Sequence, residues 1–188
     1  MRSFALLFLC IALPRLAAAD PQLLEAEVGH PVVPELMGGC SMRCAFPWET
    51  NAILPGKPPA PVYTLDDNDA ETAWLDGVVG AKLTFQFPAK LPKELEDTPF
   101  YGFDIANGVT LPESKFKEYG RVKKMRLYYN GRVFADAELA DTRRWQTVSF
   151  DDIMAREGDT FSIEILEVYP GTKYPTAAIT EFILQGAH

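Results

Sequence analysis

The sequence predicts an all-β fold, a sandwich or barrel with little helix, from three observations. Short runs in which polar and apolar residues alternate recur from about residue 82 onward, as expected for strands that bury one face. Glycine, proline and asparagine turn signals separate these runs at short intervals. No long amphipathic helical pattern lies between them, which argues against a parallel α/β arrangement.

The individual strands follow from the alternation and its breaks. Residues 82–87 alternate regularly and end at Pro88, because proline cannot donate a hydrogen bond to a sheet. Asn130-Gly131 is the strongest short hairpin signal and separates two alternating runs. The proline cluster at 55–61 predicts a loop. The expected strands span residues 46–53, 82–87, 101–105, 125–129, 133–139, 145–150, 161–169 and 177–184.

Residues 1–19 have the pattern of an export signal peptide. Arg2 supplies the positive start, residues 4–13 form an apolar run, and three alanines at 17–19 give a cleavage site. The apolar run is shorter than the roughly 20 residues that a membrane-spanning helix needs, so no transmembrane segment is expected. The alternative is a cytosolic protein with a hydrophobic first helix. We expect a secreted or periplasmic protein.

The charge of the chain argues against a nucleic-acid partner. Removal of residues 1–19 takes away Arg2 and Arg15, so the formal charge becomes −10 instead of −8. Phosphate binding requires clustered lysine and arginine in a basic domain. The single dense basic run, at 121–126, is typical of the solvated face of a strand.

The cysteines and the remaining length indicate one disulfide-bonded domain behind a leader. After loss of Cys10 with the signal, Cys40 and Cys44 form an even pair in an oxidising compartment, and we expect a disulfide between them. The alternative, a zinc or redox pair, would need further ligands, yet the histidines lie only at positions 30 and 188. Residues 20–39 contain scattered prolines and predict an extended, poorly ordered leader. Residues 40–187 would then be the domain.

Three stretches of sequence resemble a known family. Residues 66–74, Asp-Asp-Asn-Asp-Ala-Glu-Thr-Ala-Trp, resemble the opening loop of discoidin-like, galactose-binding-fold domains, Asp-Gly-Asp-x-x-Thr-x-Trp, with Asn68 at the glycine position. Residues 105–124 and 167–182 resemble the NADase-type glycan-binding domain, named from the translocation domain of a secreted bacterial NAD-glycohydrolase. The pair Cys40 and Cys44 is similar to one that precedes such domains in exported bacterial proteins. The resemblance implies a jelly-roll β-sandwich that binds glycan or docks a partner, without catalytic residues.

The candidate ligand-binding residues are aromatic and polar side chains at strand ends and turns. Aromatic faces beside a few hydrogen-bonding groups are what a sugar site requires. The candidates are Trp74, Asn107, Arg121, Tyr169, Lys173 and Tyr174. Two alternatives stay open, because Trp74 is also suited to the core beneath the acidic loop and Tyr169 to packing against its own strand.

The acidic loop also suggests a calcium site. Asp66, Asp67, Asn68 and Asp69 place several oxygen ligands within a short segment, which suits the six-to-eight-oxygen shell of Ca²⁺. The alternative is a solvated turn in which the same side chains accept backbone hydrogen bonds. Ca²⁺ is the one cofactor that the sequence suggests.

The sequence therefore favours a secreted, non-catalytic module that binds a glycan through loops at one end of a β-sandwich. One alternative is an envelope-associated accessory protein that docks another exported protein. A second is a glycoside-acting enzyme, because the separation of its many carboxylates is not fixed by sequence. Nucleophilic hydrolases are disfavoured, since no histidine lies inside the expected domain to serve as the base.

Overall fold

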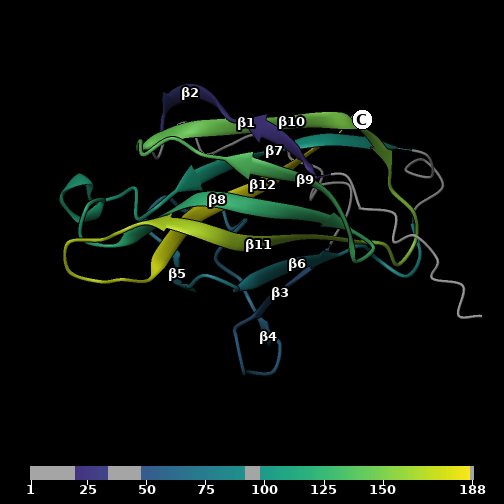
Figure 1. Ribbon diagram of the computed structural model, residues 1–188, viewed down its shortest axis with the longest axis horizontal. Coiled ribbons are helices and arrows are strands. Elements are labelled where there is room, and N and C mark those ends of the chain that lie inside the picture. The colour runs from purple at the N-terminus through teal and green to yellow at the C-terminus, as the bar shows by residue number, and fades with distance from the viewer. Residues whose placement is uncertain (1–19, 34–47, 92–97, 187–188) are drawn as a thin grey trace, which may run out of the picture.

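The computed structural model describes residues 20–33, 48–91 and 98–186, which form two layers of strands around one core (Figure 1). Among these residues the regular secondary structure is almost entirely strand, with one short 3₁₀ helix. The elements are β1 (Gln22–Glu25), β2 (Glu27–Pro31), β3 (Glu49–Ile53), β4 (Ala60–Pro61), β5 (Trp74–Gly77), β6 (Lys82–Gln86), β7 (Pro99–Asn107), η3 (Glu113–Lys115), β8 (Gly120–Tyr129), β9 (Arg132–Glu138), β10 (Arg144–Met154), β11 (Thr160–Tyr169) and β12 (Ala177–Gly186).

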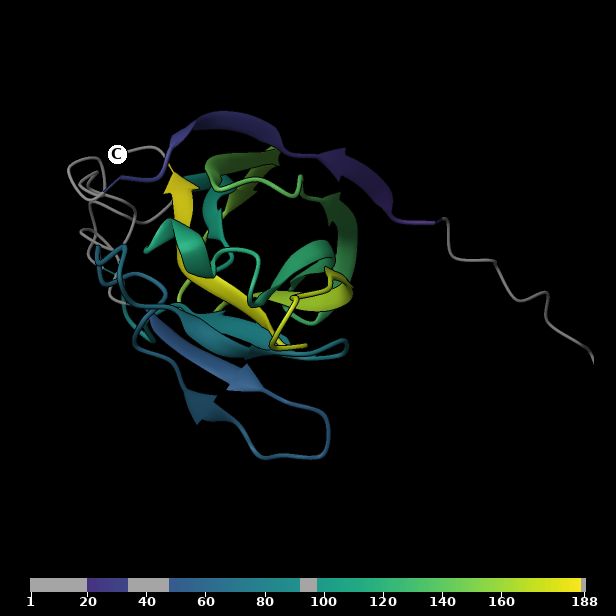
Figure 2. The same ribbon diagram turned by 90° about the vertical axis from the view of Figure 1, so that its left-hand side faces the viewer.

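Hydrogen bonds connect the strands in the order β2-β10-β7-β12-β8-β11-β6-β3-β4, with β5 beside β12, β9 beside β8, and β1 beside β9. β12 joins the two layers. Its residues 181–186 pair antiparallel with β7, whereas Ala177 and Ala178 pair parallel with the start of β8. Figure 2 shows the strands enclosing the core. The all-β, jelly-roll fold class is confirmed, and the crossing of β12 draws the two layers together at one end.

Every strand expected from alternation is present, and β8 and β9 form the hairpin predicted at Asn130-Gly131. Both turn residues have positive φ, 48° for Asn130 and 74° for Gly131, which is the conformation that such a two-residue turn demands. A strand was expected to begin at Trp74, directly after the acidic loop, and β5 begins there and pairs with β12. β4 was not predicted, because it is two residues long and lacks alternation, and its pairing with β3 decides its conformation.

The core is built around stacked phenylalanines from both layers. Phe103 and Phe182 stack with ring centroids 4.5 Å apart, and Phe182 stacks on Phe85 at 4.8 Å. Phe161 and Phe100 extend this group, and all five side chains are fully buried. Each buried phenylalanine contributes roughly 1.5–3 kcal/mol, so this cluster is a main source of stability. It fixes the two layers that carry the loops.

The structure differs from the expectation of a poorly ordered leader over residues 22–31. β1 pairs parallel with β9, and β2 pairs antiparallel with β10. β9 and β10 follow one another in the chain, so this segment crosses from one layer to the other and covers an edge of each. Its side chains are mostly exposed, so backbone hydrogen bonds to β9 and β10 hold the segment in place and side-chain burial contributes little. Alternation could not reveal it, because such a segment needs no apolar face.

Several predictions fall outside the described residues. The signal peptide at 1–19, the cysteines at 40 and 44, and the leader beyond residue 33 lie there. The disulfide and the assignment of residues 40–187 as one domain stay predictions.

Candidate functional site

Four loops meet at the end of the sandwich where β7 stops and β8 begins, on the left of Figure 1 and toward the viewer in Figure 2. They comprise residues 66–73, 108–119, 140–143 and 170–176. Hydrogen bonds tie them together: Thr110 Oγ1 lies 3.5 Å from the carbonyl of Ala70, and the backbone N–H of Thr172 donates to Lys117 at 2.8 Å. All six predicted ligand-binding residues lie at or near this end.

Two of the six, Asn107 and Arg121, are buried and serve the structure. The Asn107 amide donates to the carbonyl of Val122 at 2.7 Å and accepts the Val122 N–H at 3.0 Å. Arg121, 3% exposed, forms a two-pronged ion pair with Asp141. Arg121 also donates to the carbonyls of Tyr119 and Pro170. Its guanidinium thus ties three loops together, so neither side chain is presented to a ligand.

Trp74 and Tyr169 also belong to the scaffold. Trp74 is 6% exposed and joins the main core cluster, as the alternative interpretation proposed. The Tyr169 hydroxyl donates to the carbonyl of Leu139 at 3.0 Å, which ties the end of β11 to the end of β9. Both residues hold the loop end in place.

Lys173 and Tyr174 are the predicted residues that the structure leaves accessible. The rings of Tyr174 and Tyr119 stack with centroids 4.4 Å apart, and Lys173 Nζ lies 5.2 Å from the Tyr174 ring and 3.7 Å from Glu118. Gly171 makes this arrangement possible, because a Cβ there would lie 2.2 Å from the carbonyl oxygen of Tyr174. Only glycine allows the loop to approach itself so closely.

A hollow of about 620 Å³, here called the terminal hollow, lies beside the Tyr119–Tyr174 pair. Its size falls in the range of small-ligand sites, and its wall combines apolar side chains with one lysine and one carboxylate. It is lined by Glu71, Ala73, Leu75, Val109, Leu111, Pro112, Lys115 and Tyr119.

The acidic loop adopts the backbone-bonded turn that was the alternative to a metal site. Asp67 Oδ1 accepts the N–H of Asp69 at 3.0 Å, and Asp69 Oδ1 accepts that of Glu71 at 2.9 Å. Thr72 Oγ1 donates to Asp67 Oδ2. Asn68 has φ 58°, the left-handed conformation that asparagine tolerates almost alone among residues with a side chain. Asn68 therefore takes a positive-φ conformation that glycine would also adopt.

Glu181 on β12 lies beneath this loop and is fully buried. Its Oε1 accepts the N–H of Asp69 at 3.1 Å. Burial, a hydrogen bond to Asp67 and the negative charges of Asp67 and Asp66 raise the pKa of Glu181 to about 9. At neutral pH the carboxyl of Glu181 is thus protonated and donates its proton to Asp67.

The carboxyl groups of Asp67 and Glu181 show how a cation would fit beneath the acidic loop. In the described part of the chain no three acidic, histidine or cysteine side chains gather as a metal site, so the four predicted ligands do not converge. However, Oε2 of an ionised Glu181 has no hydrogen-bond donor and faces a second carboxylate, an arrangement that a cation would stabilise. Asp67 and Glu181 would hold Ca²⁺, with carbonyl, hydroxyl or water oxygens completing the shell. Such an ion would brace the loop against β12.

Sequence reasoning missed Tyr119, Asp141 and Glu181. Tyr119 and Asp141 lie in loops without a recognisable motif, and only folding brings them to Tyr174 and Arg121. Glu181 carried a signal, because it is a charged residue within the otherwise buried strand β12. A carboxylate in such a run calls for a partner.

The two-layered fold is that of a discoidin-like β-sandwich. The chain belongs to the family of the NAD glycohydrolase translocation F5/8 type C domain, whose model matches residues 61–185. This confirms the resemblance read from the three sequence stretches.

Among solved structures, the chain is similar to one described as the CBM32-1 and CBM32-2 domains of ZmpB from Clostridium perfringens. The TM-score is 0.53 at 10% sequence identity, and the match covers 90% of this chain and 42% of that chain. At this identity the likeness supports the fold alone. No curated protein matches the sequence. Within the described ranges no helix has the length and apolar character needed to cross a membrane.

Proposed function

We propose that the protein is a secreted, non-catalytic module that binds a glycan at the terminal hollow. The observation that carries this proposal is the stacked pair Tyr119 and Tyr174 beside that hollow, with Lys115, Lys173 and Glu71 within the same loop end. Aromatic faces accept the apolar side of a sugar ring, while charged and polar groups bond its hydroxyls. Arg121, which helps to position the pair, has its hydrogen-bond donors paired within the protein.

The similarities support a binding role. The family is that of a translocation F5/8 type C domain, and the structure that is similar in fold is described as CBM32 domains. The non-catalytic part of the proposal is consistent with the close carboxyl pair at this end, Asp67 and Glu181, because Glu181 is fully buried and out of reach of a substrate.

A glycan array probed with the purified mature protein, with and without millimolar Ca²⁺, tests this function. We expect selective binding that Tyr174→Ala abolishes. Tyr101→Ala is the matched control, because Tyr101 is 38% exposed on β7 and lines none of the hollows described here. Binding that survives Tyr174→Ala would place the sugar elsewhere. An array without signal from folded protein would refute glycan binding.

The second candidate is docking of another exported protein. It is favoured by the family's description as a translocation domain and by Leu75, Val78 and Val79, apolar side chains that are 40%, 36% and 57% exposed on β5 and the following turn. Exposed apolar residues that gather in one place are typical of interaction surfaces. Under this function the array stays blank, and Val79→Ser weakens association with the partner protein without unfolding the domain.

A further inference from the structure

Two more hollows lie near the terminal hollow, and each hollow shares lining residues with the next one. The first hollow, about 330 Å³, is lined by Trp48, Glu49, Thr50, Asn51, Pro61, Val62, Tyr63, Leu65 and Asp66. A middle hollow of about 510 Å³ shares Pro61, Val62 and Tyr63 with it. The middle hollow also shares Ala73 and Leu75 with the terminal hollow. The three therefore follow one another along the segment from β3 to β5.

Tyr63 stands between the first and middle hollows and is 78% exposed, the highest value among the exposed large apolar side chains of the described residues. Its backbone is held on both sides. The N–H of Val62 donates to the carbonyl of Thr50 at 2.9 Å, and the buried Leu65 accepts the N–H of Phe182 at 2.6 Å. The ring is thus an exposed aromatic face on a fixed support, and protein folding alone gives no reason for that exposure.

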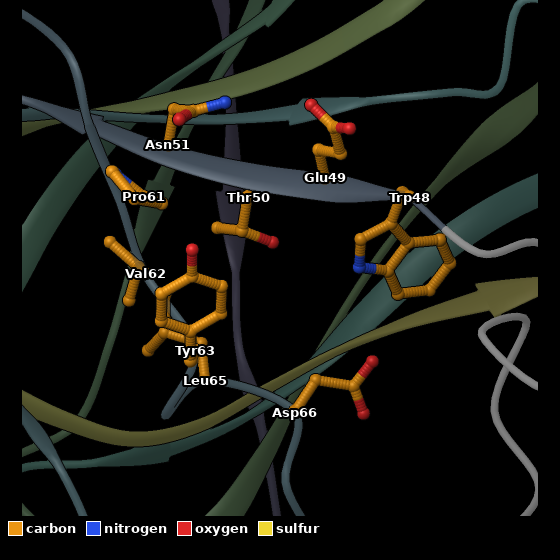
Figure 3. A pocket seen from close by; sticks show the side chains of 9 residues that line it. All are labelled: Trp48, Glu49, Thr50, Asn51, Pro61, Val62, Tyr63, Leu65 and Asp66. Carbon is orange, nitrogen blue, oxygen red and sulfur yellow. The ribbon is translucent and has the colours of Figure 1, made fainter.

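The first hollow has the chemistry of a sugar site. Figure 3 shows Trp48 and Thr50 on the same side of β3, facing Tyr63 and Asp66 of the adjoining segment. Trp48 is buried and packs edge-on against Phe85 and Phe87, so it forms the core side of the hollow, and Tyr63 supplies the exposed ring. The apolar side of a pyranose stacks on such a ring, and its hydroxyls bond to polar groups such as the Thr50 hydroxyl. The edge strand β4 is rich in proline, which disfavours the alternative of an added peptide strand.

The charges along the three hollows define the kind of sugar. Carboxylates outnumber lysines on the combined walls: Glu49, Asp66, Glu71 and Asp76 against Lys57 and Lys115. An anionic chain of uronic acids would be repelled, because like charges in a recessed site cost free energy. Neutral and amino sugars face no such penalty.

We propose that the Trp48–Tyr63 hollow is a second saccharide subsite, so that the protein takes a linear oligosaccharide of neutral or amino sugars across all three hollows, with Tyr63 as its central stacking platform. This inference rests on the proposed glycan binding and specifies its ligand as an extended chain. A ligand that occupies both ends gains affinity, because its second contact becomes intramolecular.

Calorimetric titration with oligosaccharide ladders, from monosaccharide to hexasaccharide, tests the proposal. The probes are β-1,4-linked oligomers of N-acetylglucosamine, glucosamine and glucose, and α-1,4-linked oligomers of galacturonic acid. We expect at least one neutral or amino-sugar ladder to bind about tenfold or more tightly at tetrasaccharide length than at disaccharide length. Galacturonate should bind more weakly at every length. Tyr63→Ala should remove the length dependence while the short sugars keep their affinity, and Tyr101→Ala should change neither.

The outcomes separate this inference from the proposed function. Short sugars that bind at the terminal hollow with no gain on lengthening would overturn the second subsite and leave the glycan-binding function standing. A length dependence that survives Tyr63→Ala would also overturn it, because the chain would then run elsewhere. If no ladder binds and the array is blank, both proposals fail.

Discussion

Glu181 offers the most direct test of the physical reasoning, because one substitution should change how stability depends on pH. The carboxyl has a pKa of about 9 in the folded chain and an ordinary value of 4.5. Between these values the folded state binds one more proton than the unfolded state. The stabilising contribution of the Glu181 carboxyl is therefore present in full below about pH 4.5 and is lost as the pH rises toward about 9.

The size of the effect follows from linkage. One group that is protonated in the folded state and ionised in the unfolded state changes the free energy of unfolding by about 1.4 kcal/mol per pH unit. We expect the native protein, in the presence of a chelator, to lose stability with this slope near neutral pH, in addition to the contributions of other groups. Glu181→Gln keeps the shape and a hydrogen-bond donor toward Asp67 but cannot ionise, so its slope should be shallower by about that amount.

Urea unfolding at a series of pH values between 5 and 9 measures both slopes as free energies of unfolding, with the approximate window set by the pKa of Glu181. The comparison between the two proteins cancels the groups that they share. Equal slopes for the native protein and Glu181→Gln would refute the assignment of a protonated Glu181 beneath the acidic loop.

Three further predictions concern the loop end. Excess Ca²⁺ at pH 7 should raise the melting temperature of the native protein, by the equivalent of about 2.7 kcal/mol at a hundredfold excess over the dissociation constant, and should not stabilise Glu181→Gln; calorimetry without any shift would exclude the ion. Arg121→Ala should cost about 3 kcal/mol in urea unfolding, because two loop carbonyls lose their donor and Asp141 keeps only Lys117 as a partner. Lys173→Ala should change stability by less than about 0.5 kcal/mol, and similar losses in both variants would contradict the structural role of Arg121. Asn107→Ala should cost about 2 kcal/mol, because the N–H and carbonyl of Val122 lose their buried partner, and a neutral result would show that water replaces the amide.

The strands that could be predicted from sequence are those whose side chains alternate between core and solvent. The runs that became β6 to β11 carry much of this pattern, since they bury one face against the phenylalanine core, whereas β12 is a largely apolar run that is buried on both faces. β1 and β2 lack it, because their pairing to β9 and β10 is made by backbone groups that every sequence possesses. Alternation of polar and apolar side chains indicates a strand with one buried face. A strand that is held by backbone hydrogen bonds alone does not require this alternation, so its sequence does not reveal it.

The sequence by itself determined the fold class, the Asn130-Gly131 hairpin and the family, because each depends on local conformation or on a contiguous motif. Only the tertiary structure decided which of the candidate residues face solvent. It buried Asn107 and Arg121 as braces, left Tyr174 accessible against Tyr119, and placed Glu181 beneath Asp67. Exposure, stacking and a shifted pKa depend on neighbours distant in the chain, and those neighbours are fixed only when the two layers pack together.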